Sequence, residues 1–301
     1  MTLKIDSVSK AYNGQKILDS IDLEIKDHEI MGFAGINGAG KTTTMKIASG
    51  VIFPTSGDVF INGKSILTDT RNAKLDMAWI PETPIFDPLD LPISLFLAYG
   101  YYFGKSRAEI KEEAAKLMQQ VHLAGLMKKR IGKFSNGMKK RLMVALSLFQ
   151  DPRNFLLDET FTSLDPEGAR FLRENLIKLR SEGKAIMLST HILSELEGLA
   201  DKIAIIHKGK IVSVASMEEI MKCSVFTIKC DDELHNLGRA LEEFGIIVFK
   251  DGAYELHLSD NKRATSWEIG KALENSGIRV ISVEKKEGTI ERYFFEKIGE
   301  I

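Results

Sequence analysis

The sequence is poor in cysteine, in net charge and in long apolar runs, and each shortage excludes a class of protein. The only cysteines among the 301 residues are Cys223 and Cys230, too few for a disulfide framework and consistent with a reducing cytosol. The 41 basic and 42 acidic residues nearly cancel, which gives no sign of a nucleic-acid or anionic-membrane surface. The most apolar stretch, residues 91–103, is shorter than the roughly 20 residues that a membrane-spanning helix needs.

Residues 1–6 lack the basic-then-apolar layout of a signal peptide, so we expect a cytoplasmic protein. A role in a membrane process would then require another polypeptide to supply the membrane-spanning part. With 44% apolar and 28% charged residues, the composition is that of a soluble globular protein. Its length indicates two domains, or one large domain with an appendix.

The most informative stretch is residues 35–42, which match the G-x-x-x-x-G-K-[ST] phosphate loop in full. An apolar run before it predicts a buried strand, and residues 43–49 after it predict a helix; a glycine-rich turn that merely precedes a helix is the alternative. Backbone N–H groups of such a loop bind phosphate, Lys41 contacts the β- and γ-phosphates, and Thr42 ligates Mg²⁺. The predicted nucleotide-binding residues are Gly35, Asn37, Gly38, Ala39, Gly40, Lys41, Thr42 and Thr43.

A buried strand predicted at residues 155–158 ends in two adjacent acids, Asp158 and Glu159. Adjacent side chains of a strand point in different directions, so the two acids can have different roles. We predict that Asp158 holds Mg²⁺ through water and that Glu159 accepts the proton of an attacking water. A metal and a general base are the minimum for hydrolysing a γ-phosphate. The alternative is a strand that exits into solvent with two solvated acids.

Short apolar strands alternate with helices, which predicts an α/β fold with a parallel sheet. We predict a P-loop NTPase core with an antiparallel β subdomain in the opening third and a helical subdomain at about residues 87–150. After about residue 221 the order β-α-β-β-α-β predicts a small α+β domain of ferredoxin-like type, with a terminal helix. The predicted domains are residues 1–221 and residues 222–301.

Two helix starts matter for the site. Ser135 precedes apolar residues at helical spacing, so it can cap a helix with one buried face. Asp165 and Pro166 predict the start of another helix, with Asp165 as its cap. The basic cluster at residues 139–141 is expected on a solvated face, with contact to a phospholipid or a partner as the alternative.

Between residue 3 and about residue 215 the chain resembles the ATP-binding subunit of an ABC transporter, because the motifs of that family occur in order. Residues 134–138, Phe-Ser-Asn-Gly-Met, occupy the place of the signature L-S-G-G-Q, which other phosphate-loop ATPases lack. Pro81 and Glu82 fall at the loop that usually carries a glutamine. Further matches are Tyr12, where the family stacks an aromatic ring on adenine, Ser163 and Asp165 in the loop that crosses between protomers, and His191 as the switch histidine.

The resemblance implies a dimer that encloses two ATP molecules, each held by the phosphate loop of one subunit and the signature of the other. The signature residues acting in trans are Ser135, Asn136, Gly137 and Met138. It also implies that His191 contacts the γ-phosphate and that Thr42, Asp158 and Glu82 hold Mg²⁺. ATP and Mg²⁺ are therefore the expected cofactors. The expected partners are an identical or different ATP-binding subunit and a transmembrane permease, with no nucleic acid.

Asn136, Met138 and Glu82 depart from the family pattern. The first two replace a glycine and the glutamine of the signature, and Ser135 and Gly137 remain. Glu82 replaces the usual glutamine, so it can ligate a hard cation but cannot donate a hydrogen bond when ionised. The Pro-Glu pair and the size of the C-terminal appendix resemble bacterial exporter-type subunits.

We predict an ATPase that dimerises around two MgATP and drives a separate permease at the inner face of the cell membrane. One alternative is a soluble ABC-type ATPase acting on nucleic acid or ribosomes, which usually carries two fused halves or a long coiled-coil insertion. A second is a phosphate-loop kinase. Residues 91–103 are predicted to face the permease or to form the core of the helical subdomain. The C-terminal domain is open to a regulatory, dimerising or spacer role.

Overall fold

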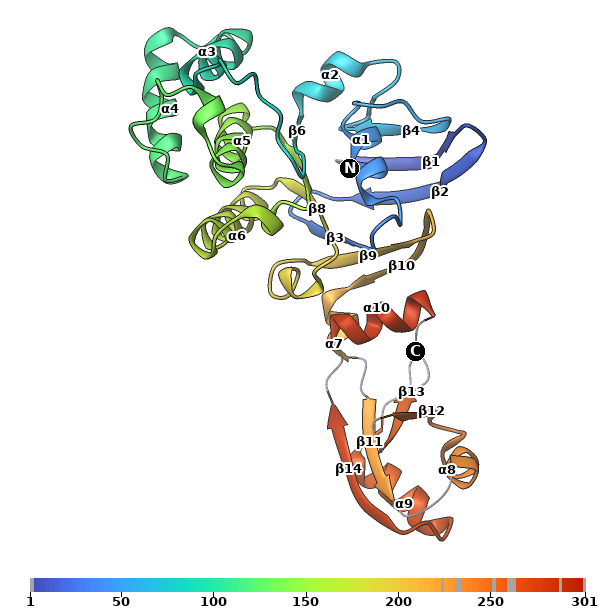
Figure 1. The fold of residues 1–301 in the computed structure, drawn as a ribbon. Helices are drawn as coiled ribbons and strands as arrows, with labels where there is room; N and C mark the ends of the chain where they lie inside the picture. Colours follow the sequence, from blue (N-terminus) through green and yellow to red (C-terminus); the bar gives the residue numbers. More distant parts are fainter. Residues whose placement is uncertain are drawn as a thin grey trace. The chain divides into compact units, whose positions relative to one another are not determined.

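The computed structural model describes residues 3–222, 225–230, 234–250, 253–258, 264–286 and 289–299. Its contacts divide the chain into two compact units, Met1–Val214 and Ala215–Ile301. Each unit is described by itself (Figure 1). The boundary predicted after residue 221 remains a prediction of domain organisation, because compactness alone does not show which part folds independently.

The first unit opens with a four-stranded sheet in which every strand pair is antiparallel. Two Asn-Gly turns, at Asn13 and at Asn62, close its hairpins with positive φ at both turn residues. Such turns match the twist of the strands that they join. The predicted antiparallel β subdomain is therefore confirmed. In spatial order its strands are β2 (Gln15–Ile25), β1 (Leu3–Tyr12), β4 (Ser56–Ile61) and β5 (Lys64–Ser65).

A six-stranded sheet forms the centre of this unit, and β3, β7 and β8 are buried along their whole length. Its pairings β9–β3, β3–β8, β8–β7 and β7–β6 are parallel, as predicted for a P-loop NTPase core. The carboxyl ends of these strands therefore meet at one edge, where ligands bind in open α/β sheets. In spatial order the strands are β10 (Lys210–Ser216), β9 (Lys202–His207), β3 (Ile30–Ala34), β8 (Ala185–Thr190), β7 (Asn154–Asp158) and β6 (Met77–Ile80).

Three helices form the predicted helical subdomain, which Figure 1 shows gathered apart from β1, β2 and β4. Phe96 and Phe149 meet edge to face inside it, with ring centroids 5.2 Å apart. A Cβ on Gly100 would lie 2.3 Å from the Ile110 side chain, so glycine permits the close approach of two of these helices. Ser106 and Glu109 form a capping box at the start of one of these helices. The helices are α3 (Pro92–Tyr102), α4 (Arg107–Gln120) and α5 (Asn136–Gln150).

The remaining helices of the first unit connect these layers. They are α1 (Lys41–Ala48), α2 (Thr70–Leu75) and α6 (Pro166–Ser181), with short 3₁₀ turns at Ile131–Lys133, Phe161–Ser163 and Leu193–Glu195. The α1 helix starts within the phosphate loop, two residues before the predicted start. Over the described ranges, no helix has the length and apolarity required to cross a bilayer.

The C-terminal unit contains a four-stranded antiparallel sheet in the order β12-β13-β11-β14. The first and third strands of the β-α-β-β-α-β order are therefore neighbours, which confirms the predicted ferredoxin-like arrangement. Buried residues of α8 and α9, such as Leu237 and Leu273, pack with Phe226 and Leu256 of the sheet. The elements are α7 (Met217–Lys222), β11 (Val225–Cys230), α8 (Leu234–Leu241), β12 (Gly245–Lys250), β13 (Ala253–Leu258), α9 (Ser266–Asn275), β14 (Val280–Lys286) and α10 (Ile290–Ile298).

Candidate active site

The phosphate loop runs from the end of β3 into α1. Gly38 and Gly40 have φ of 81° and 113°, values that side chains disfavour, and Gly40 is the residue before the helix. A Cβ on Gly35 would lie 2.7 Å from the carbonyl oxygen of Ile206, on the adjacent end of β9. The sequence needs glycine at these positions because the loop turns sharply and is packed against a neighbouring strand.

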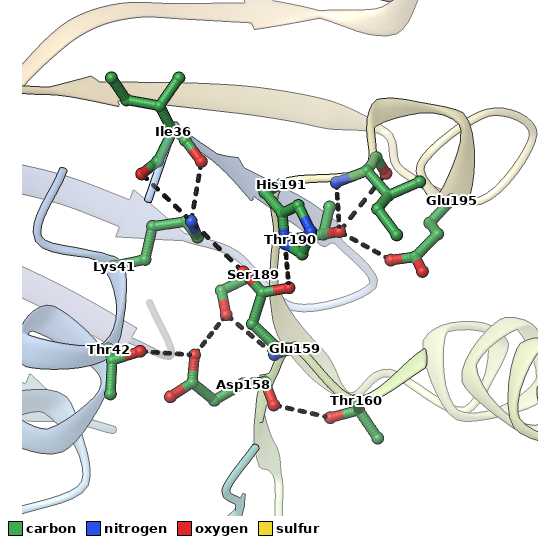
Figure 2. A network of polar contacts seen from close by, with 12 residues as sticks. Ile36, Lys41, Thr42, Asp158, Glu159, Thr160, Ser189, Thr190, His191 and Glu195 are labelled. Atoms are coloured by element: carbon green, nitrogen blue, oxygen red, sulfur yellow. Dashed lines mark hydrogen bonds and ion pairs between the residues drawn. The ribbon is translucent and has the colours of Figure 1, made fainter. Parts of the chain in front are cut away.

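Lys41 is 6% exposed and its ammonium folds back onto the loop. Its Nζ donates to the carbonyl oxygens of Gly35, at 2.7 Å, and Ile36, at 3.4 Å (Figure 2). It also lies 3.3 Å from Glu159 Oε1. An ammonium group has three donors, so a phosphate oxygen can replace one of these acceptors without leaving the buried charge unpaired.

One hydroxyl group holds both acids at the end of β7. Asp158 lies opposite Ser189 of β8, and Ser189 Oγ donates to Asp158 Oδ1 at 2.6 Å. Ser189 Oγ also accepts a hydrogen bond from the backbone N–H of Glu159, at 3.1 Å. Thr42 Oγ1 donates to Asp158 Oδ1 at 3.4 Å, which ties α1 to this pair (Figure 2). The sequence analysis placed Ser189 only in a strand; a polar residue ending a buried strand was the available signal.

Asp158 carries a buried oxygen that is unsatisfied. Its Oδ2 has no hydrogen-bond partner among the residues that the structure describes. Burial raises the pKa of Asp158 above its usual value, the bonds from Ser189 and Thr42 oppose that rise, and the charges of Glu159 and Glu82 add to it. Orphaned buried oxygens of this kind are costly unless a cation or a donor approaches them.

Glu159 is 6% exposed, and both its carboxylate oxygens are engaged. The Nδ1–H of His191 donates to Oε2 at 2.7 Å, while Lys41 lies near Oε1 (Figure 2). The backbone of Glu159 is left-handed, with φ of 46°, a conformation that costs about 1 kcal/mol for a residue with a Cβ. A strained residue with a fully engaged carboxylate is typical of a functional position.

Lys41, Glu159 and His191 line a cleft of about 400 Å³. Nine of the predicted site residues line it, together with Ile17, which the sequence analysis did not single out. Glu82 is exposed and follows β6, whereas His191 follows β8, and β7 lies between these two strands in the sheet. The predicted residues that line it are Asn37, Gly38, Gly40, Lys41, Thr42, Thr43, Glu82, Glu159 and His191.

Comparisons with known proteins identify this arrangement. The family described as ABC transporter matches residues 18–162. The bacitracin transport ATP-binding protein BcrA of Bacillus licheniformis is 31% identical over 303 residues, covering 99% of this chain and 97% of that protein. The lantibiotic transport ATP-binding protein SrtF of Streptococcus pyogenes is 36% identical, covering 70% of this chain and 89% of that protein. A solved ATP-binding subunit of an ABC transporter is 28% identical with a TM-score of 0.70, covering 74% of this chain and 92% of that one.

The chain belongs to the ABC transporter family. It is an ATP-binding, ATP-hydrolysing subunit of that family, as the sequence resemblance predicted. The alternative of a soluble ATPase acting on nucleic acid or ribosomes is not favoured. ATP is therefore a ligand of this chain.

The signature of this ABC subunit lies outside its own cleft. Ser135 is the N-cap residue of α5, and its Oγ accepts the N–H of Met138 at 3.2 Å, as predicted for a cap. Ser135 and Asn136 are exposed, while Gly137 is half-buried. None of the four signature residues lines the cleft that holds Lys41.

The other predicted residues, the buried Asp158 among them, also lie apart from the lining of the cleft. Tyr12 ends β1, is 48% exposed, and has Lys10 Nζ 4.8 Å from its ring centroid. Gly35 and Ala39 are buried within the loop. Asp165 is the N-cap residue of α6, as predicted, and its carboxylate binds Arg141 Nη2. Ser163 ends the 3₁₀ turn Phe161–Ser163, and the roles proposed for these residues in the ABC subunit remain predictions.

The expectation for the basic cluster at residues 139–141 is wrong for two of its members. Lys140 is fully buried, and its Nζ donates to the carbonyl oxygen of Glu159 at 2.7 Å. The side chain of Arg141 is only 15% exposed because it binds Asp165. A run of three charges usually lies in solvent, but α5 turns Lys140 toward the core, beside Glu159 at the end of β7.

Asp158→Asn is expected to stabilise the nucleotide-free protein, because it removes a buried charge that has an orphaned oxygen. Because the pKa of Asp158 is raised in the folded protein, its ionised form lowers the free energy of unfolding. This destabilisation is absent at pH values below 3.8, the pKa of an unfolded aspartate, and complete above the folded-state pKa. At pH 8 we expect a gain of about 1 kcal/mol, or roughly 2–4 °C in melting temperature. Thermal unfolding at several pH values checks this, and a gain that shrinks as pH rises would contradict it.

Proposed function

We propose that this ABC subunit dimerises around two MgATP and drives export through a separate transmembrane permease at the inner face of the cell membrane. The dimer partner is an identical or a different ATP-binding subunit. Relatives named for bacitracin and lantibiotic transport and for Nod factor export support an export role. We assign ATP binding to residues 1–221 and a separate, accessory role to residues 222–301.

The donor set at the phosphate loop fits Mg²⁺. Thr42, Asp158 and Glu82 offer hard oxygen ligands, and the orphaned Oδ2 of Asp158 is an acceptor that needs a cation or a donor. Magnesium usually takes one or two protein carboxylates and completes its shell with phosphate and water. When bound, Mg²⁺ would neutralise charge on the β- and γ-phosphates.

In the proposed hydrolysis, Glu159 accepts the proton of a water that attacks the γ-phosphate. Its carboxylate is held from two sides, by His191 at Oε2 and by Lys41 at Oε1. When ATP binds, Lys41 turns its ammonium toward the β- and γ-phosphates, which frees Oε1 to accept the proton. His191 keeps the carboxylate oriented and contacts the γ-phosphate through its other ring nitrogen.

The observation that carries the dimer proposal is the position of Ser135. It lies at the exposed N-terminus of α5, outside the cleft of its own chain. Helix N-termini bind anions through free N–H groups and the helix dipole, and α5 is 15 residues long. A γ-phosphate reaching this position must come from the cleft of a second subunit.

The permease surface is proposed at a second cleft, of about 590 Å³, between the helical subdomain and the central sheet. Tyr99, Tyr102 and Phe103 line it from residues 91–103, and Trp79 lines it from β6. Tyr99 and Tyr102 are 39% and 57% exposed, which leaves an aromatic surface for a partner to cover. The buried Phe96 on the same helix packs into the core of the subdomain, and we propose that the exposed tyrosines on another face contact the permease.

Tyr102→Glu is therefore expected to weaken co-purification with the proposed transmembrane permease by about tenfold or more, because it buries a charge in an apolar contact. ATP hydrolysis by the isolated subunit should stay within about twofold of wild type. Tyr101→Glu is the matched control, since Tyr101 is 55% exposed on the same helix but does not line the cleft. Equal retention of the permease by both variants would refute this docking surface, and no co-purification with wild type would refute the permease role.

A further inference from the structure

Lys140 is the most deeply buried charge near the site, and no step of the proposed hydrolysis uses it. It lies in the second turn of α5 and is 0% exposed. Its Nζ donates a hydrogen bond to the carbonyl oxygen of Glu159, at 2.7 Å. Burying an ammonium group costs several kcal/mol unless charges and hydrogen bonds compensate it. An apolar residue at this position would therefore give a more stable fold if stability were the only requirement.

Four carboxylates near the ends of the central strands favour the charged form of the buried Lys140 ammonium group. Burial lowers the pKa of Lys140, and the charges of Glu82, Asp158, Glu159 and Glu195 oppose that fall. Three of these acids were predicted to act on the nucleotide or its metal. The ammonium of Lys140 therefore sits behind the reactive cluster, in a position to hold groups of the site while remaining out of reach of solvent.

The atom that Lys140 binds belongs to a strained segment. Glu159 has φ of 46°, and its backbone N–H is held by the Oγ and the carbonyl oxygen of Ser189, at 3.1 and 3.2 Å. Its carbonyl is held from the other side by Lys140. The left-handed backbone thus has one support from β8 and one from α5, and such strain persists only where surrounding contacts fix it.

The next residue of α5 holds the far end of the same segment. Arg141 Nη2 binds the carboxylate of Asp165, six residues after Glu159 in the chain. A Cβ on Gly168, in the first turn of α6, would lie 2.9 Å from Asp165 Oδ1 and 3.2 Å from Arg141 Nε, so this contact is packed tightly. Two adjacent residues of one helix therefore fix both ends of residues 159–165.

We propose that Lys140 is a positioning residue for ATP hydrolysis: it holds the left-handed backbone of Glu159 from α5 and so aims the Glu159 carboxylate at the attacking water. The inference rests on the proposed role of Glu159 as the general base. The same helix presents Ser135 at its N-terminus, so α5 links the signature to the base within one chain. Without the bond the backbone of Glu159 relaxes, and the carboxylate moves from its aligned position.

The test compares Lys140→Met, Lys140→Arg and the control Lys139→Met in steady-state hydrolysis of MgATP. Lys140→Met keeps the length of the side chain but removes the donor. We expect its kcat to fall about tenfold or more, since a small misplacement of a catalytic group has effects of that size, with KM for ATP within about twofold. Lys140→Arg restores a donor and should recover most of kcat. Lys139→Met changes the neighbouring, half-buried lysine and should match wild type.

A double-mutant cycle separates positioning from a general effect on the fold. If Lys140 acts through Glu159, then Lys140→Met should change the residual rate of Glu159→Gln by less than about twofold. The inference would be overturned if Lys140→Met lowered kcat equally in the wild-type and Glu159→Gln proteins. It would also be overturned if a rise in KM accounted for the lost activity, or if Lys140→Met kept a wild-type kcat. Wild-type turnover of Glu159→Gln alone would instead refute the role of Glu159. If Lys140→Met does not fold, Lys140→Gln replaces it, because its amide falls short of Glu159 and must also lower kcat.

Discussion

Glu159→Gln is expected to keep ATP bound while slowing hydrolysis by roughly 10²-fold or more, the scale of a lost general base. The amide has nearly the same shape, so the hydrogen bond with His191 and the packing around Glu159 can persist. It cannot accept the proton of the attacking water. Because the nucleotide then stays intact, the variant should also accumulate as a nucleotide-bound dimer.

Single-turnover hydrolysis and light scattering with and without MgATP measure the two effects of Glu159→Gln. Glu174→Gln is the matched control, since Glu174 is exposed on α6 and remote from the cleft lining. A slow variant that remains a monomer under saturating MgATP would contradict the signature acting in trans and leave the base assignment intact. Rapid turnover would contradict the base assignment itself.

Lys41→Ala should abolish turnover and weaken ATP binding by about 10²-fold or more, the effect of removing one partner of a buried charge pair. In the free protein Lys41 binds two carbonyl oxygens of the loop and faces Glu159, so its loss also leaves the buried Glu159 carboxylate with one neighbour fewer. Binding of a fluorescent ATP analogue, read by displacement with ATP, gives the affinity.

Lys46→Ala is the control for this experiment, because Lys46 is half-buried on the same helix and does not line the cleft. It should bind and hydrolyse ATP as wild type does. Tight binding and normal turnover of Lys41→Ala would refute the phosphate-loop assignment. Equal losses in both variants would show damage to α1 rather than loss of a phosphate contact.

The residue pattern of the phosphate loop made most of the cleft predictable. A glycine loop between a strand and a helix has few possible geometries, and the acids at Asp158 and Glu159 follow a strand whose apolar residues require burial. Parallel strands place their carboxyl ends together, so Lys41, Glu159 and His191 had to meet once the sheet was parallel. The sequence pattern around these residues is therefore enough to predict that they lie together in the folded chain.

Other features depend on contacts between segments that the local pattern does not specify. Ser189 was assigned only to a strand, yet the register of β7 and β8 puts its hydroxyl between both acids. Asp165 has the sequence of a helix cap, but the carboxylate binds Arg141 of another helix instead. The sequence pattern predicts that the Asp165 carboxylate accepts from N–H groups of its own helix. The charged Arg141 guanidinium, which packing brings close, binds that carboxylate more strongly than a neutral N–H group does.

The sequence by itself indicated the family, through the resemblance of its ordered motifs. It also predicted most strands and helices and the residues around the phosphate loop, because those follow from short-range backbone geometry and the period of apolar residues. Only the tertiary structure decided that Lys140 is buried against Glu159 and that Ser135 lies outside its own cleft. Which way a helix turns a given side chain depends on the long-range packing of that helix. Charge alone made Lys140 look solvated; its position on α5, against the ends of the central strands, placed it inside.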